Sequence, residues 1–347
     1  MRFAIVGCGA VGARAARQLL STPGVDEVIL RDTRVDHLHA LAASLGEAAL
    51  AEEPPYDAAP RADAIIIATP AGTHAPLAAA ALARRAWVVS VSDSIDDVRL
   101  LLALDEEARR AGRAVAAGAG LAPGLTCVLA RFGSHAFRSV DEIHVAKVGT
   151  GGPACARQHH RALSDTALDW RDGEWVRRRG ASGRELSWFP EPIGGRDCYR
   201  AALPDALLLV SEFPDTARIT SRMGATRRDR LTMHLPMLRP PHAEGGPGGV
   251  RVELRGTRLD GARDVAVYGV MDRPAVAAGA VAAVTALWAV TGQLRVNGAG
   301  GLARLVDAAP FLRELSIRGI RAAVFDGTPR VPPLPQPLSD AVDKPAN

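Results

Sequence analysis

The sequence has 347 residues, of which 48% are hydrophobic and 23% charged, and this composition excludes a largely disordered chain. The length exceeds that of a common single domain, so we expect two domains or one elaborated α/β domain. The net charge of +4, with acidic and basic residues interleaved, argues against a nucleic-acid partner.

Residues 1–120 alternate short apolar runs with helical patterns, which is typical of parallel β-α-β units. Strands are predicted at 2–6, 28–30, 64–68, 87–91 and 114–117, and helices at 10–20, 38–45, 74–85 and 96–111. Residues 1–124 are therefore expected to form an α/β domain with a Rossmann-type, doubly wound parallel sheet.

The alternation of short apolar runs with helical patterns ends after Gly124. A helix is predicted at 126–132, and extended segments at 140–148, 206–213, 218–223, 250–255 and 264–270. Asp260-Gly261 lies between the last two segments and predicts a β-hairpin. Residues 125–273 are therefore expected to form a second, α+β domain that contains a largely antiparallel sheet.

The C-terminal part begins with an alanine-rich helix from Pro274, and a shorter helical segment is predicted at 302–315. Residues 242–249 hold four glycines and one proline, which predicts a mobile loop. Residues 328–347 contain six prolines and are expected to form a disordered tail.

The turn after the first strand carries a GxGxxG pattern, Gly7-Cys8-Gly9-Ala10-Val11-Gly12, directly before a helix. The first glycine permits a tight turn, the second lets the backbone approach a diphosphate, and the third lets the helix pack on the strand. The amides of the first helical turn attract the phosphates. This pattern predicts a dinucleotide-binding site formed by Gly7, Gly9, Ala10, Val11 and Gly12.

Asp32 follows Gly12 by twenty residues, at the end of the second strand, where a carboxylate accepts hydrogen bonds from ribose hydroxyls. A carboxylate there favours NAD, because it repels the 2′-phosphate of NADP. Arg31 and Arg34 flank Asp32, and Arg34 in particular could instead receive that phosphate. The predicted cofactor is therefore NAD or NADP, with NAD slightly favoured.

A polar turn follows the strand at 64–68, at the edge where ligands of open α/β sheets bind. Thr69, Pro70 and Thr73 are predicted to line the ribose and the nicotinamide. His74 is a weaker candidate for a proton donor, since a histidine that opens a helix is often an ordinary loop residue.

The run from Asp63 to Leu82, with IATPAGTH at its centre, resembles the sugar-type oxidoreductases related to glucose–fructose oxidoreductase. Members of that family carry Glu-Lys-Pro after the fifth strand, and the lysine serves catalysis. The corresponding residues 89–94 contain no lysine. The resemblance therefore implies an alternative function, oxidation or reduction of a sugar or polyol.

Ser92-Asp93-Ser94 and the Gly-x-x-Pro-Gly segment at Gly120 to Gly124 resemble the saccharopine dehydrogenase-like family, which includes saccharopine reductase, lysine 6-dehydrogenase and carboxynorspermidine dehydrogenase. The resemblance covers residues 1–135 and, more weakly, 265–295. It implies an NAD(P)-dependent enzyme that reduces an imine or oxidises an amine at a C–N bond of an amino-acid-like substrate.

The same resemblance implies that helices within 274–327 complete the nucleotide domain and that the sheet of the second domain forms a homodimer. Gly120 and Pro123 are then expected beside the cofactor. Gly124 is expected at a helix opening whose amides face a substrate carboxylate, and the alternative is that Pro123-Gly124 is a simple interdomain hinge.

Hydride transfer to an imine can require a proton donor, and histidine is the usual one near neutral pH. His159 and His160 lie in the densest polar cluster of the second domain, with Arg161 as a candidate for binding a substrate carboxylate. The alternative is that these residues have no role in catalysis and lie on a solvated face of a helix or loop.

Three further polar residues are candidates. Tyr199 is a possible acid, and Asp197 beside it a possible substrate-binding group. Asp93 could orient a histidine or bind a substrate ammonium, or simply cap a helix.

Only Lys147 and Lys344 are lysines among the 42 basic residues, so lysine chemistry has few candidates. Lys147 ends a predicted strand and is expected to be solvated.

Four well-separated cysteines show neither a disulfide framework nor zinc-ligand spacing, and we expect no metal site. The start of the chain lacks the pattern of a signal peptide, and the apolar stretch at 275–290 is too short to span a membrane. A cytoplasmic oxidoreductase with a small-molecule substrate and no membrane partner is therefore expected. A third alternative is a catalytically inactive dinucleotide-binding sensor or partner subunit.

Overall fold

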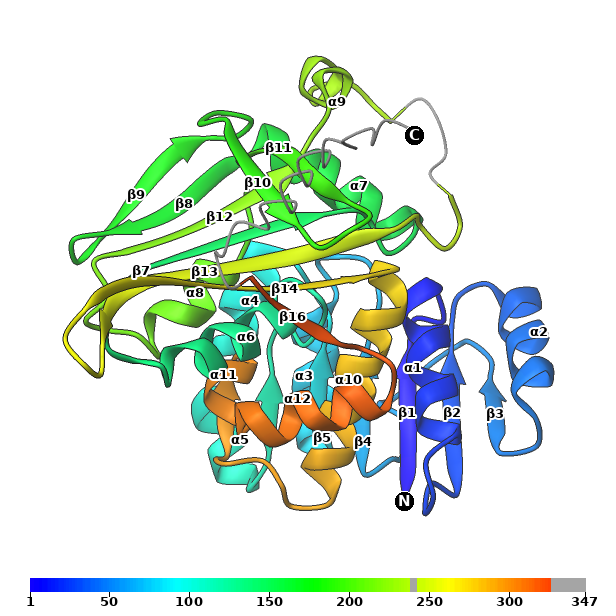
Figure 1. The fold of residues 1–347 in the computed structure, drawn as a ribbon. Coiled ribbons are helices and arrows are strands. Elements are labelled where there is room, and N and C mark those ends of the chain that lie inside the picture. Colours follow the sequence, from blue (N-terminus) through cyan, green and yellow to red (C-terminus); the bar gives the residue numbers. More distant parts are fainter. Residues whose placement is uncertain (238–241, 326–347) are drawn as a thin grey trace, which may run out of the picture.

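The structure, a computed structural model, describes residues 1–237 and 242–325. It contains a parallel sheet surrounded by helices and a second, mixed sheet that lies across one end of it (Figure 1). The predicted fold class is confirmed. The tail predicted to be disordered, 328–347, lies outside the described residues.

The first sheet has the strand order β3-β2-β1-β4-β5-β6-β15, and every neighbouring pair is parallel. This order reverses direction between β1 and β4, which is the switch point where ligands bind in such sheets. Its strands are β1 (Arg2–Val6), β2 (Glu27–Arg31), β3 (Ala49–Glu52), β4 (Ala64–Ile67), β5 (Trp87–Ser90), β6 (Ala114–Ala116) and β15 (Gly298–Gly300).

The four residues of β4 are all fully buried, as expected for a central strand covered on both faces. The helices of this part and of the segment that follows are α1 (Ala10–Leu20), α2 (Val35–Leu45), α3 (His74–Ala83), α4 (Ile95–Leu102), α5 (Asp105–Ala111), α6 (Leu125–Ser134), α10 (Pro274–Val290), α11 (Leu302–Leu305) and α12 (Ala308–Ile317).

The alanine-rich helix α10 packs against α1, β4 and β5. A Cβ atom on Gly279 of α10 would lie 2.6 Å from the Cβ of Arg14 on α1, so only glycine permits this close crossing. The structure thus brings α10 and β15 back to the nucleotide-binding half of the molecule.

The second sheet has the order β10-β11-β12-β7-β13-β14-β16, and the hairpin of β8 and β9 joins it through β12. All its pairs are antiparallel except β12 with β7. Its strands are β7 (Phe137–Val148), β8 (Thr166–Arg171), β9 (Glu174–Arg179), β10 (Glu185–Phe189), β11 (Gly194–Arg200), β12 (Arg218–Gly224), β13 (Gly248–Arg258), β14 (Arg263–Asp272) and β16 (Ala322–Phe325).

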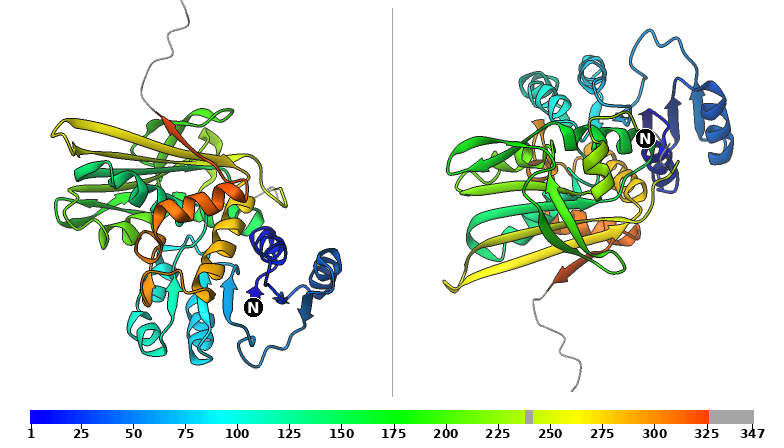
Figure 2. Two further views of the ribbon diagram at one scale, coloured as in Figure 1. Left: turned by 60° about the horizontal axis from the view of Figure 1, so that its bottom comes forward. Right: turned by 90° about the horizontal axis from the view of Figure 1, so that it is seen from above.

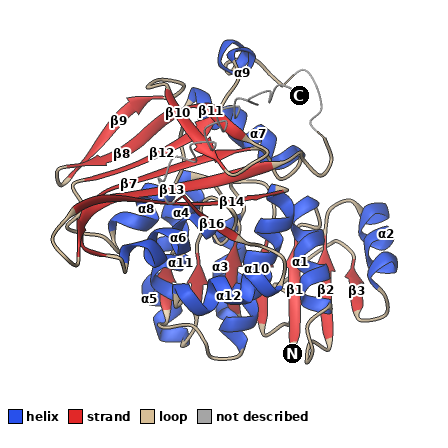
Figure 3. Cartoon of the chain, viewed as in Figure 1, coloured by secondary structure: helices blue, strands red, loops and turns tan. Residues whose placement is uncertain are grey.

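The helices that lie between the strands of this sheet along the chain are α7 (Pro153–Ser164), α8 (Asp205–Val210) and α9 (Arg227–Thr232). Figure 2 shows the sheet, with the yellow hairpin of β13 and β14, from two further sides. In Figure 3 the helices gather mainly around the first sheet, whereas the second sheet is built mostly of strands. The second sheet faces the edge at which the parallel strands end (Figure 1).

Most predicted elements are confirmed, including the hairpin of β13 and β14 around Asp260-Gly261. The extended segment predicted at 206–213 is wrong, because this part of the chain forms α8. An apolar run of this length does not distinguish a strand from a helix, and in the structure the helix begins at Asp205, directly after Pro204.

Two further differences concern element boundaries. The single helix predicted at 96–111 is two helices, α4 and α5, although Gly112 ends the second one in a left-handed conformation as expected. The strand β16 pairs with β14, so residues 322–325 belong to the second sheet rather than to the predicted nucleotide domain. Within the described residues, no helix is both long and apolar enough to cross a membrane.

Candidate active site

The GxGxxG turn has the geometry that a diphosphate site needs. Gly7 has φ +96°, and a Cβ there would lie 2.6 Å from the carbonyl carbon of Ala68. A Cβ on Gly12 would lie 2.0 Å from the Gly7 oxygen. A Cβ on Gly9 would meet no atom of the described chain within 4 Å. Gly7 and Gly12 are therefore required by the fold, whereas Gly9 keeps the backbone open to a ligand.

Gly9 is also the N-cap residue of α1, so Ala10 and Val11 present the first amides of the helix at this turn. These amides carry partial positive charge toward a bound phosphate. The residues predicted for the diphosphate thus lie together at the switch point between β1 and β4.

Asp32 lies at the end of β2 beside the same turn. Its Oδ2 accepts a hydrogen bond from the Cys8 amide at 2.8 Å, and its Oδ1 accepts one from the Arg34 amide at 2.9 Å. Burial alone would raise the pKa of Asp32, but these amides and the Arg34 guanidinium lower it below its ordinary value. Asp32 is therefore an anchored carboxylate at neutral pH.

The turn after β4 holds the predicted ribose and nicotinamide residues. The hydroxyls of Thr69 and Thr73 are 2.7 Å apart, and Thr73 also donates to the carbonyl of Pro70 at 3.0 Å. This turn follows the carboxyl end of β4, beside the glycine turn, because a Cβ on Gly7 would meet Ala68 and Thr69.

His74 does not face this edge as a proton donor. It is completely buried, with Nδ1 2.8 Å from the Ser90 hydroxyl and Nε2 2.9 Å from the Thr69 carbonyl. Burial lowers its pKa, so it is a neutral side chain that braces the turn against β5.

Asp97 on α4, which was not a candidate in the sequence analysis, holds the turn after β4 in place. Both carboxylate oxygens of Asp97 accept a hydrogen bond from the Gly72 amide at 3.0 Å, and Oδ2 also accepts the Ser92 hydroxyl at 2.7 Å. Ser94 caps α4, so the alternative reading of Asp93 as a helix cap is wrong. Asp93 is left to interact with the second domain.

The Gly-x-x-Pro-Gly segment forms a tight loop before α6. The Gly120 amide donates to the Pro123 carbonyl at 3.0 Å, and the Leu125 amide donates to the Gly120 carbonyl at 2.9 Å. Gly124 has φ +120°, and a Cβ there would lie 2.3 Å from the Gly120 oxygen. This packing turns the carbonyl of Ala122 toward the second sheet.

Lys147 on β7 reaches that loop. Its Nζ donates to the Ala122 carbonyl at 3.0 Å and to Asp93 Oδ2 at 3.2 Å. The side chain is only 5% exposed. The prediction of a solvated lysine is therefore wrong: β7 alternates Ile143, Val145 and Lys147 onto the face that packs against the first domain.

His159 lies beside the same carboxylate. Its Nε2 is 2.8 Å from Asp93 Oδ2, as the proposed pairing of Asp93 with a histidine requires. Cys155, one helical turn earlier on α7, places its Sγ 3.4 Å from the same Nε2. Asp93, Lys147, His159 and Cys155 therefore form one cluster between the two sheets, which we call the interdomain cluster.

In the interdomain cluster, the positive charges of Lys147 and His159 stabilise the negative charge of Asp93. Burial would raise the pKa of Asp93, but Lys147 and His159 beside it hold that pKa well below the usual range. Burial would lower the pKa of His159, but Cys155 and Asp93 raise it to about 9 against the opposing charge of Lys147. At neutral pH the Asp93 carboxylate is thus flanked by the protonated His159.

The thiol of Cys155 also responds to this environment. Burial raises its pKa, but the neighbouring His159 outweighs burial and lowers the pKa below its ordinary value. Donor atoms of Asp93, Cys155 and His159 lie within 4.8 Å of one another, so this cluster has the ligand types of a metal site that spacing in the sequence did not indicate. The Lys147 ammonium already supplies positive charge to the same carboxylate.

A second carboxyl group lies close to this cluster. Asp205, completely buried at the start of α8, accepts the Thr126 hydroxyl at 2.6 Å, while its other oxygen has no hydrogen-bond partner in the described chain. Burial raises its pKa, although Thr126 and Lys147 oppose the shift. No feature of the local sequence distinguishes this aspartate.

The remaining candidates do not join the interdomain cluster through any described contact. The ring of His160 is 2.9 Å from the Leu235 carbonyl, and Arg161 is exposed on α7. Asp197 pairs with the exposed Arg184 at 3.0 Å, and Tyr199 is buried under the Arg230 guanidinium, 4.3 Å from its ring centroid. The arrangement gives no support to catalytic roles for His160 and Tyr199 or to substrate binding by Arg161 and Asp197.

A comparison with protein families supports the nucleotide-binding fold of the first domain. Residues 1–91 match the GFO/IDH/MocA model, described as an oxidoreductase family with an NAD-binding Rossmann fold. The protein is accordingly an NAD-binding oxidoreductase with its cofactor site in the first domain. No curated protein is significantly similar to the chain in sequence.

One solved structure shares the fold over most of the chain. The apo saccharopine dehydrogenase (L-Glu forming) of Saccharomyces cerevisiae has a TM-score of 0.70 and 14% identity, with 93% of this chain and 99% of that chain covered. GenD2 from gentamicin A biosynthesis, in complex with NAD, has a TM-score of 0.47 and 18% identity, covering 94% and 96%. A myo-inositol dehydrogenase of Corynebacterium glutamicum has a TM-score of 0.45 and 13% identity, covering 94% and 99%.

Proposed function

We propose that this oxidoreductase transfers a hydride to or from a C–N bond of an amino-acid-like substrate, and that the interdomain cluster handles the accompanying proton. The observation that carries the proposal is the buried contact of Lys147 Nζ with Asp93 Oδ2 and the Ala122 carbonyl. The loop that resembles saccharopine dehydrogenase-like enzymes is therefore the same loop that holds the lysine.

The cofactor expected at the glycine turn supplies or accepts the hydride when it is bound. The residues present fit such a group, since Gly9 leaves the backbone open and the first amides of α1 lie beside it. We propose NAD as the preferred form, because the anchored carboxylate of Asp32 can accept ribose hydroxyls and repels a 2′-phosphate.

Lys147 is the group that we assign to proton transfer. An ammonium group has three protons, and the described contacts of Nζ use two of them. The third proton remains to be donated to a substrate nitrogen as an imine is reduced, or an uncharged Nζ accepts a proton as an amine is oxidised.

Asp93 and His159 position and stabilise this lysine. The carboxylate of Asp93 fixes the direction of Nζ, and the protonated His159 fixes the carboxylate in turn. Ile143 and Val145, which share the inner face of β7 with Lys147, are fully buried, and Lys147 itself is only 5% exposed. A dry environment strengthens each of these electrostatic contacts.

A sugar- or polyol-type dehydrogenase remains the second candidate, and one observation favours it. Lys147 comes from β7, yet its Nζ lies beside Asp93, just after β5, where the sugar-type enzymes are expected to carry their lysine. A lysine at this place can equally accept a proton from a hydroxyl group.

The experiment that tests the proposal is a fluorescence titration with NADH and NADPH, followed by a turnover screen. Pairs of a 2-keto acid and an amine are tested with the reduced cofactor, and sugars and polyols with the oxidised one. Turnover confined to the keto acid and amine pairs supports the proposal. Turnover of polyols alone contradicts it in favour of the second candidate, and cofactor binding without any turnover favours the inactive sensor.

A further inference from the structure

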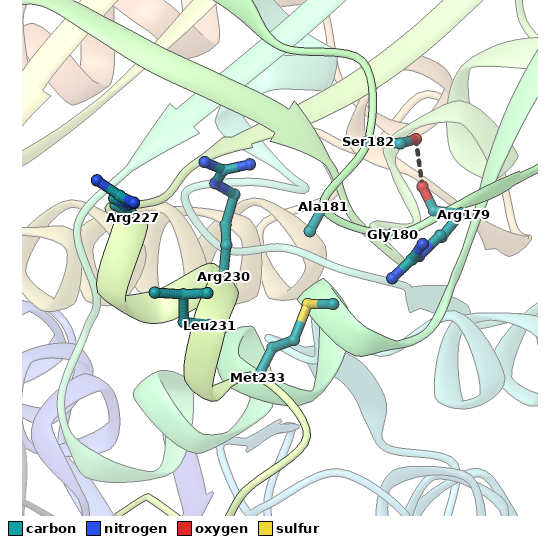
Figure 4. A pocket seen from close by; sticks show the side chains of 8 residues that line it. All are labelled: Arg179, Gly180, Ala181, Ser182, Arg227, Arg230, Leu231 and Met233. Carbon is teal, nitrogen blue, oxygen red and sulfur yellow. Dashed lines mark hydrogen bonds between the residues drawn. The ribbon is translucent and has the colours of Figure 1, made fainter.

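A basic pocket lies outside the interdomain cluster, between α9 and the segment that follows β9 (Figure 4). It encloses about 320 Å³, close to the lower end of the size range of small-molecule sites. Arg227, Arg230 and Leu231 reach it from α9 and Met233 from just beyond, while Arg179 to Ser182 form the opposite wall. None of these residues contacts Asp93, Lys147 or His159 in the described hydrogen bonds and ion pairs.

The pocket concentrates positive charge that the described chain does not neutralise. Arg179, Arg227 and Arg230 all line it, and none of them forms an ion pair among the described residues. Asp229 is the only acidic residue of α9, and its carboxylate accepts both the amide and the hydroxyl of Thr226 in a capping box.

Arg230 is fixed in place and still has an unused donor. Its guanidinium stacks on the ring of the buried Tyr199 at 4.3 Å. Stacking of this kind orders the side chain before any ligand arrives, which reduces the entropy lost on binding. Its Nε is buried and has no hydrogen-bond partner in the described chain. A buried unpaired donor of this kind is costly unless a ligand satisfies it.

We propose that this pocket binds a small molecule through a doubly negative group, either a phosphate monoester or a dicarboxylate. Three arginines more than balance the two charges of a dianion, and the planar guanidinium fork binds phosphate and carboxylate oxygens in pairs. Ala181, Leu231 and Met233 supply an apolar wall for a short carbon skeleton. None of the lining residues belongs to the glycine turn, so the proposed ligand is a molecule other than the dinucleotide.

Calorimetric titration of the full chain at low ionic strength, without cofactor, tests the proposal. Sodium phosphate and sodium malonate are the two probes. The probe that binds with the higher affinity shows whether the ligand is a phosphate monoester or a dicarboxylate. We expect saturable binding of at least one probe, weakened about tenfold or more in Arg230→Gln and in Arg227→Gln, because each loses a charge-assisted hydrogen bond.

Arg228→Gln is the matched control, since Arg228 is exposed on the same helix but does not line the pocket. It is expected to change the affinity by less than about twofold. Arg227 is also exposed, so Arg227→Gln tests the site even if loss of the Tyr199 stack impairs folding of Arg230→Gln. Absence of saturable binding of either probe to the unaltered chain, or an equal loss in Arg228→Gln, overturns the proposal.

Discussion

The glycine turn and the interdomain cluster are two halves of one candidate active site, but they are built differently. The glycine turn is made of neighbouring residues, Gly7 to Gly12, whose backbone alone defines the geometry. The interdomain cluster joins Asp93 to Lys147 and His159, which lie 54 and 66 residues further along the chain. A backbone site is therefore visible in a short sequence pattern, whereas a site made of side chains exists only after the two sheets pack together.

This contrast predicts that changes in the interdomain cluster impair chemistry while changes at the glycine turn impair cofactor binding. The largest effect is expected for Lys147→Met, which removes the proposed proton donor. Turnover should fall by about 10²–10⁴-fold, the usual contribution of general acid–base catalysis, with little change in NADH affinity. Stopped-flow turnover and NADH fluorescence measure the two quantities on the substrate found in the screen.

Lys344→Met is the control for that variant, because Lys344 is the only other lysine of the sequence. It should retain full turnover. An unchanged turnover in Lys147→Met, or a parallel loss in Lys344→Met, would remove Lys147 from the mechanism.

The pKa of His159 predicts a pH dependence of stability. Its value rises from 6.5 to about 9 on folding, so the stabilisation is complete below pH 6.5 and is lost as pH rises through about 9. This loss is on the order of a few kcal/mol, since one pKa unit corresponds to about 1.4 kcal/mol. Urea unfolding at pH 6 and pH 9.5 should show that His159→Gln depends less on pH than the unaltered chain. Equal pH dependence in both would contradict the assignment.

The glycine turn offers a matched pair of variants. Gly12→Ala places a methyl group 2.0 Å from the Gly7 oxygen and should destabilise the protein by about 1–3 kcal/mol or more. Gly9→Ala meets no atom of the described chain and should leave unfolding nearly unchanged while weakening NADH binding. Thermal unfolding and NADH titration of both variants measure this difference. The prediction is contradicted if the Gly12→Ala variant is as stable as the unaltered chain, or if the Gly9→Ala variant binds NADH with unchanged affinity.

The smallest expected effect is that of Asp32→Ala on cofactor choice. Loss of the hydrogen bonds to the ribose should weaken NADH binding about tenfold, and NADPH binding should change less or improve. Parallel titrations with the two cofactors measure the ratio. A loss shared equally by NADH and NADPH would mean that Asp32 only braces the turn through Cys8 and Arg34.

Much of the fold follows from local pattern. The strands of the first domain, its glycine turn and the hairpin of β13 and β14 all carry short-range signals. The strand β3 and the helix α8 were not predicted, since β3 is a half-buried edge strand of four residues and α8 is a short apolar run. In both, packing rather than periodicity decides the structure.

The site was predicted only in part, for the same reason. Asp93 and His159 were both candidates, and the structure brings them within hydrogen-bond distance of each other. Lys147 was assigned to solvent, because nothing in its neighbours shows that β7 turns this residue toward the first domain. The available signal was the rarity of lysine. The chain has 40 arginines and only two lysines, and one of these lysines, Lys147, is buried.

The rarity of lysine also gives the most direct test of whether Lys147 lies at the reacting end of the cofactor. Labelling the chain with ¹³Cε-lysine yields two NMR signals, which Lys147→Met and Lys344→Met assign. Addition of NADH should shift the Lys147 signal and leave that of Lys344 in place. If NADH binds with a fluorescence change but both signals stay where they were, Lys147 is not beside the nicotinamide and the proposed role in proton transfer is wrong.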